Sequence, residues 1–141
     1  MDNGIAIGLG VFFILMFIIF IIAIVFGIIG IVSNWKLFEK AGKPGWAAIV
    51  PVYNIWNMSE IATGNPLDCI LWLIPYVNLV IMIYCLYGFY KSFGANTGEI
   101  IISLLLFPIV PIKVLLYPEN YEYLGPQIVS PCDKLGLYYR K

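Results

Sequence analysis

The sequence contains no histidine and carries little charge. Its 141 residues include 8 Lys or Arg and 8 Asp or Glu, which balance to a net charge of zero. The missing histidine excludes histidine-based acid–base catalysis, histidine metal ligands and Ser-His-Asp triads. The balanced charge leaves no basic patch for DNA or RNA, so we expect no nucleic-acid partner.

Cysteine is also sparse. The chain has three cysteines, Cys69, Cys85 and Cys132, and none of them belongs to a CxxC motif. Zinc and iron–sulfur sites need clustered thiolates, so we expect no metal site and no cofactor. A phosphate-binding glycine loop and a GxSxG motif are missing as well. These absences favour a protein that is not an enzyme.

What the sequence has in abundance is apolar side chains. Hydrophobic residues make up 62% and charged residues 11% of the chain, against roughly 45–50% and about 25% in ordinary globular chains. A soluble domain of this size leaves roughly a third of its surface in water and could not hide so much apolar area. The composition predicts an integral membrane protein whose first partner is the lipid bilayer.

The longest apolar run covers residues 4–32. It exceeds the roughly 20 residues that a spanning helix needs. It follows Asp2 instead of a basic region, which predicts a retained helix and not a cleaved signal peptide. We expect this helix to end at Asn34-Trp35-Lys36, where Trp35 suits the membrane interface.

Small residues recur at four-residue spacing within this run. Such pairs let helices approach closely, although glycine is also common in membrane helices for other reasons. The candidate packing residues are Gly4, Gly8, Ala23 and Gly27.

Three further apolar segments follow, at residues 46–62, 66–90 and 99–117, and each contains proline. The first is marginal and predicts either a short broken crossing or an interfacial or re-entrant segment. We expect an all-α membrane protein with three or four spans in residues 1–117. Residues 118–141 form a polar, aromatic tail that packs on the rest, packs on a partner, or is loose.

Lysines set the predicted orientation. The loop after the first helix carries three lysines, and a fourth follows the segment 66–90. The positive-inside rule places them all on the cytoplasmic side, which puts the N-terminus outside. They are Lys36, Lys40, Lys43 and Lys91.

An even number of crossings must then separate Lys43 from Lys91. We favour four crossings in total, in which residues 46–64 cross outward, residues 67–90 return, and the tail lies outside. If residues 46–62 instead lie in the interface, the tail lies inside.

Two segments share a local pattern in which asparagine comes three residues after proline: Pro51 with Asn54, and Pro75 with Asn78. A third segment, around Pro111, has the proline but carries a lysine two residues later, at Lys113. Proline frees a backbone carbonyl about one turn earlier, and an asparagine amide can satisfy it within a kinked helix. The functional alternative is a transport site, since broken helices form substrate and ion sites in transporters. Its candidate residues are Pro51, Tyr53, Asn54, Pro75 and Asn78.

The residues 35–54, WKLFEKAGKPGWAAIVPVYN, resemble the signature of a family of small bacterial multi-span membrane proteins known as a domain of unknown function. Residues 74–78 and 91–94 resemble later motifs of that family, and a similar module precedes the catalytic part of some signal peptidase I proteins of Bacteroidetes. The resemblance implies a compact module with a cytoplasmic Gly-Lys-Pro-Gly loop in the bacterial cytoplasmic membrane. It implies no catalytic role, because this chain is too short to hold the extracytoplasmic peptidase domain. In this motif we expect Tyr53 and Asn54 to be buried polar groups that need partners, either in the helix bundle or in a neighbouring subunit.

Three functions remain in competition. The favoured one is a non-enzymatic accessory or assembly subunit of a larger membrane protein complex, which suits the small size and the aromatic tail. The alternative is a homo-oligomeric channel or transporter that uses the breaks at Pro51 and Pro75. A membrane enzyme acting on lipid is the least favoured, because histidine and a carboxylate pair are both missing.

Overall fold

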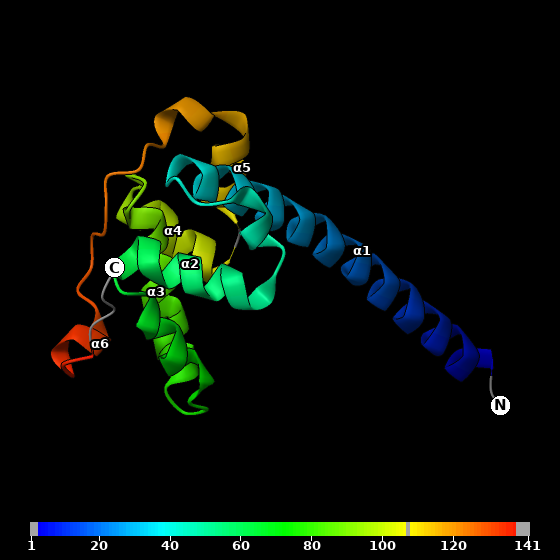
Figure 1. The fold of residues 1–141 in the computed structure, drawn as a ribbon. Coiled ribbons are helices and arrows are strands. Elements are labelled where there is room, and N and C mark those ends of the chain that lie inside the picture. Colours follow the sequence, from blue (N-terminus) through cyan, green and yellow to red (C-terminus); the bar gives the residue numbers. More distant parts are fainter. Residues whose placement is uncertain (1–2, 107, 138–141) are drawn as a thin grey trace.

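The computed structural model describes residues 3–106 and 108–137, which form helices and connections with no strand among them (Figure 1). A long helix, α1 (Asn3–Lys40), extends away from a group of short helices at its C-terminal end. The short elements are η1 (Gly45–Ala48), α2 (Pro51–Thr63), η2 (Pro66–Leu73), α3 (Asn78–Lys91), α4 (Thr97–Leu105), α5 (Ile109–Leu116), η3 (Pro118–Asn120) and α6 (Pro131–Lys134).

Helix α1 has two different parts. Residues 4–32 are exposed along almost their whole length, whereas Ser33, Leu37 and Phe38 are buried among the short helices. We call the described part of residues 33–137 the helical module. Helix α1 is the one helix among the described residues that is by itself long and apolar enough to cross a membrane.

The end of α1 differs from the prediction. We expected the helix to end at residues 34–36, but it continues to Lys40. The extension is explained by packing, because Leu37 and Phe38 are fully buried in the core of the module. The indole N–H of Trp35 also donates to Glu39 one turn later, at 2.7 Å.

The core of the module gathers side chains from α1, α2, α3, α4 and α5. Phe89 on α3 lies at its centre, with its ring edge-to-face against Phe38, Tyr90 and Phe93. Aromatic rings prefer this geometry, which adds to the free energy of their burial. The module is therefore held by a small core with an aromatic cluster at its centre, and the C-terminal end of α1 is part of it.

Local sequence signals explain the helix boundaries. Proline opens α2, η2 and α6, where its missing N–H costs nothing. Asn96 caps α4 by accepting from the Gly98 N–H at 3.3 Å. Gly64 ends α2 in a left-handed conformation that favours glycine, with φ of 81°.

The three later apolar segments are all broken. Residues 46–62 divide between η1 and α2, and residues 66–90 divide at Pro75 between η2 and α3. The last segment divides into α4 and α5, which meet at a bend of 118°. The expected kinked helices are therefore pairs of short helices joined by turns.

Candidate functional site

The first proline–asparagine pair forms a hydrogen-bonded turn. Pro51 is the first residue of α2, and the backbone N–H of Asn54 donates to the Val50 carbonyl at 2.8 Å. The side-chain amide of Asn54 reaches further back and donates to the carbonyl of Ala48 at 3.1 Å. One asparagine thus satisfies two carbonyls that precede the proline, in accordance with the sequence pattern.

The second pair repeats this arrangement. The backbone N–H of Asn78 donates to the Ile74 carbonyl at 2.8 Å, and its side-chain amide donates to the carbonyl of Trp72. In both turns the side-chain amide therefore bonds the carbonyl six residues earlier, and the backbone N–H bonds the carbonyl four residues earlier. We call these two segments, residues 48–54 and 72–78, the proline–asparagine turns.

The segment around Pro111 does not repeat the turn. Pro111 is buried within α5, and its carbonyl accepts a hydrogen bond from the Ser33 hydroxyl of α1 at 2.7 Å. The break lies earlier, between α4 and α5, where the hydroxyl of Ser103 accepts from the Val110 N–H at 2.8 Å. Here a serine side chain accepts from a later backbone N–H, whereas the asparagine amides donate to earlier carbonyls.

The turns are strongly apolar and exposed. Tyr76 is 97% exposed, Leu73 81%, and Leu106 at the end of α4 86%. Tyr53 is also exposed in this chain, and the centroid of its ring lies 5.2 Å from that of Trp46. The module therefore does not bury Tyr53, and its burial in a neighbouring subunit stays a prediction. Asn54 is half-buried, and its side-chain oxygen is buried without a hydrogen-bond partner among the described residues.

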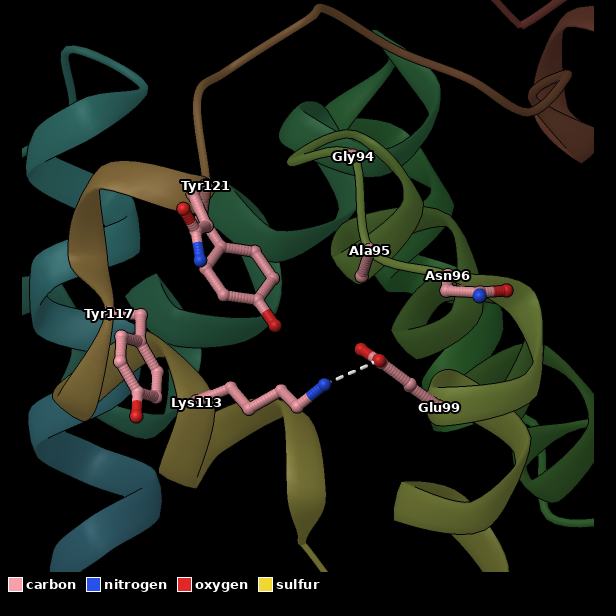
Figure 2. Close-up of a pocket in the computed structure, with 8 residues that line it drawn as sticks. Gly94, Ala95, Asn96, Glu99, Lys113, Tyr117 and Tyr121 are labelled. Atoms are coloured by element: carbon pink, nitrogen blue, oxygen red, sulfur yellow. Dashed lines mark hydrogen bonds and ion pairs between the residues drawn. The ribbon is translucent and has the colours of Figure 1, made fainter.

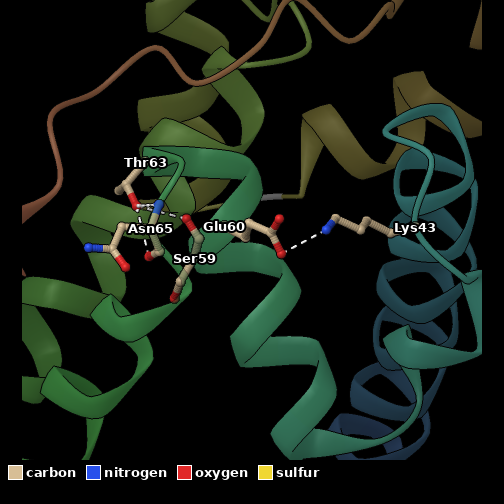
Figure 3. Close-up of polar contacts among 5 residues, drawn as sticks. All are labelled: Lys43, Ser59, Glu60, Thr63 and Asn65. Atoms are coloured by element: carbon tan, nitrogen blue, oxygen red, sulfur yellow. Dashed lines mark hydrogen bonds and ion pairs between the residues drawn. The ribbon is translucent and has the colours of Figure 1, made fainter. Parts of the chain in front are cut away.

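The four predicted loop lysines lie at the other ends of the helices. Lys43 pairs with Glu60 of α2 at 2.7 Å (Figure 3). The ammonium group of Lys40 donates to the carbonyls of Pro118 and Tyr121. The remaining two lie at helix ends as well: Lys36 in the last turns of α1, and Lys91 at the end of α3, where it donates to the Thr97 hydroxyl at 3.1 Å.

A polar cavity of about 390 Å³ opens beside this end of the module. Glu99 of α4 and Lys113 of α5 point toward one another across it and form an ion pair at 2.5 Å (Figure 2). Tyr117 and Tyr121 line the same cavity. The ion pair joins two helices whose connection is bent, so it fixes α4 against α5 at their polar ends.

The C-terminal tail packs on the module as far as it is described. Its backbone bonds α3, because the Leu124 N–H donates to the Ser92 carbonyl at 2.8 Å. Tyr138 and Tyr139, part of the predicted aromatic tail, lie outside the described residues. We call residues 121–130 the strap.

The strap is held at its end by Asp68, which sequence reasoning missed. One oxygen of this fully buried carboxylate accepts from the Ser130 hydroxyl and from the Cys132 N–H, both at 2.9 Å. Burial, together with the hydrogen bond and negative charge of Asp68, raises the pKa of the Cys132 thiol from 9.0 to about 12. The available signal was the Ser-Pro-Cys-Asp sequence at 130–133, a helix cap in which Ser130 accepts from the Asp133 N–H.

The candidate packing residues of α1 have no neighbours within the described chain. A side chain added at Gly4, Gly8 or Gly27 would meet nothing within 4 Å. Ala23 lies in the same exposed part of the helix. The described residues also contain no group of three or more His, Cys, Asp or Glu side chains placed to hold a metal ion.

These observations define an all-helical protein with one long apolar helix and a compact module of short, proline-broken helices. Residues 46–126, more than half of the chain, match the model of the DUF5684 family, described as a family of unknown function. The chain belongs to this family. The match includes the breaks at Pro51 and Pro75, helices α4 and α5, and the first part of the strap. It does not include α1. Comparisons with curated proteins and with solved structures gave no match.

Proposed function

We propose that this chain is a membrane protein of the bacterial cytoplasmic membrane that works as a non-enzymatic accessory or assembly subunit of a larger complex. The observation that carries the proposal is the free length of α1. Twenty large apolar side chains between Ile5 and Val32 are exposed. Burying one such side chain away from water contributes roughly 1.5–3 kcal/mol, so burying all of them contributes tens of kcal/mol. This free energy favours a location of α1 in lipid or against partner helices over a location in water.

A partner role is supported by the distribution of contacts along α1. The module uses only the C-terminal end of the helix, so residues 4–32 are left to contact lipid or other proteins. Helix association in a bilayer depends on close packing at small residues, which the glycines of α1 provide. The proposed subunit therefore binds its complex through α1, while the module lies at one end of that helix.

The first experiment is purification of the full chain from its own membrane in mild detergent, followed by mass and composition analysis. Other subunits at a fixed ratio are the expected result. A homo-oligomer alone would overturn the accessory role in favour of the channel or transporter alternative, and a monomer alone would overturn both.

A pair of substitutions tests whether α1 makes the contact. Gly8 and Gly10 are both open to their surroundings and lie two residues apart, which places them about 200° apart around the helix. We expect Gly8→Leu to lose the partners and Gly10→Leu to retain them. Retention of the partners by both variants would exclude this face of α1 as the contact.

A further inference from the structure

The apolar turns of the module share one side. The start of α2 and the turn before α3 lie on the lower side in Figure 1, toward which the free part of α1 descends, while η3 lies at the opposite, upper edge. Both proline–asparagine turns satisfy their own broken carbonyls through Asn54 and Asn78. Water-exposed turns do not need such internal partners, whereas backbone in hydrocarbon does.

Charge is segregated from these turns. Residues 44–59, 69–90 and 100–112 contain no Asp, Glu, Lys or Arg. The charged residues that flank the first and the last stretch pair with one another at the helix ends away from the turns, as Lys43 does with Glu60 and Lys113 with Glu99. Those that flank residues 69–90 bond other groups: Asp68 accepts from Ser130 and Cys132, and Lys91 donates to the Thr97 hydroxyl. The first and the last stretch therefore each begin and end at one ion pair, and all three stretches are free of charge along their length.

The helices that carry the stretches are too short to cross a bilayer alone. The longest of them, α3, has 14 residues, which is about 21 Å at 1.5 Å per residue, against a hydrocarbon core of about 30 Å. Helix α2 has 13 residues, and α4 and α5 have 9 and 8. The bend of 118° returns α5 toward the end at which α4 begins.

We propose that α1 alone crosses the membrane and that the module inserts its apolar turns into a single leaflet, as three hairpins that enter and leave on the same side. This inference rests on the proposed membrane location of α1, and it is independent of the accessory role. Its surface is formed by the proline–asparagine turns and the end of α4, and its partner is the acyl-chain region of the cytoplasmic leaflet. The arrangement replaces both the four crossings favoured from sequence and the three-crossing alternative.

The lysines agree with this topology. Each hairpin contributes no crossing, so Lys43, Lys91 and the strap all lie on the side of the membrane where α1 ends. The parity argument required an even number of crossings between Lys43 and Lys91, and zero satisfies it. The strap then lies on the cytoplasmic side, opposite to the prediction for four crossings.

Single introduced cysteines test the topology in the full-length chain. Gly4→Cys reports on the N-terminal end of α1, Gly98→Cys on the start of α4, and Glu122→Cys on the strap; both glycines are open and Glu122 is exposed. The reagent is an impermeant maleimide, applied to spheroplasts and then to lysed membranes. The unsubstituted chain gives the background of the native thiols, of which Cys85 and Cys132 are buried.

We expect Gly4→Cys to label in spheroplasts, and Gly98→Cys and Glu122→Cys to label only after lysis. Labelling of Gly98→Cys in spheroplasts would mean three crossings, and labelling of Glu122→Cys there would mean four. Either result overturns the inference.

A fourth variant, Tyr76→Cys, tests insertion of the turn itself. It should label in neither spheroplasts nor lysed membranes, and label fully once detergent is added. Labelling before detergent would show that the turn is in water and would overturn the insertion.

Extraction with alkaline carbonate separates this inference from the proposed function. Release of the chain into solution would contradict the membrane location and therefore both proposals. Retention in the membrane together with a labelling pattern other than the expected one would contradict only the hairpin topology.

Discussion

Removing the Asp68 carboxylate should release the end of the strap. In the folded chain one Asp68 oxygen accepts two hydrogen bonds, from the Ser130 hydroxyl and the Cys132 N–H. A hydrogen bond to a charged group contributes about 1.5–3 kcal/mol, so Asp68→Ala should cost about 3 kcal/mol of strap docking. That corresponds to an increase on the order of a hundredfold in the open population, which exposes the Cys132 thiol.

The assay is the rate at which Cys132 reacts with a thiol reagent at neutral pH, followed by peptide mass spectrometry. Asp68→Ala also removes a negative charge and so lowers the pKa of the Cys132 thiol, which by itself raises the rate. Asp68→Asn supplies the matched control, because it removes the same charge but retains an acceptor oxygen. We expect the alanine variant to react at least tenfold faster than the asparagine variant.

Cys85, fully buried on α3, reports on the rest of the module in the same experiment. It should stay unreactive in both variants, because only the strap opens. Equal Cys132 rates in the alanine and asparagine variants would refute the two hydrogen bonds as the clamp. Simultaneous exposure of Cys85 would show that the strap and the core unfold as one unit.

Three further predictions concern single positions. A Cβ atom at Gly45 would lie 2.2 Å from the indole of Trp35. Gly45→Ala should therefore lower the free energy of unfolding, measured by denaturation in detergent, by about 1–3 kcal/mol. The control Gly98→Ala, at a position open to its surroundings, should not lower it. Asn78→Leu leaves a turn carbonyl unsatisfied and should lower the unfolding free energy by about 1–3 kcal/mol; an unchanged value would show that water or lipid headgroups replace the amide. The pKa of the Cys132 thiol is raised to about 12, so the neutral thiol favours the folded state below pH 9, and the stability of the parent chain relative to Cys132→Ala should fall as pH rises from 9 to 12.

The helical class and the long first helix could be read from the sequence, because a run of apolar residues needs no tertiary contact to be recognised. The hydrogen bonds of Asn54 and Asn78 were also predictable, since they join residues six apart. The bend of 118° between α4 and α5 was not, because proline marks where a helix breaks and leaves open how far the next helix turns. A kinked span and a hairpin share the same local pattern and differ in packing against the rest of the chain.

The Asp68 clamp shows a second limit of sequence reasoning. Its partners are 62 and 64 residues away, and nothing in the local sequence of Asp68 points to them. Gly45 is similar: the resemblance placed it in a Gly-Lys-Pro-Gly loop and did not indicate that its missing side chain makes room for the Trp35 ring. Both features depend on tertiary contacts, which no local pattern in a single sequence encodes.

The continuity of α1 has a mechanical consequence. The helix enters the core of the module without a break, so its free part and its buried end at Leu37 and Phe38 move as one rod. A rod of 38 residues is about 57 Å long, far more than the thickness of a bilayer core. In the proposed arrangement, a change in membrane thickness or the binding of a partner near Gly4 would change the tilt of α1. Because the helix is continuous, this change in tilt would rotate the module and alter how deeply the apolar turns insert into the leaflet.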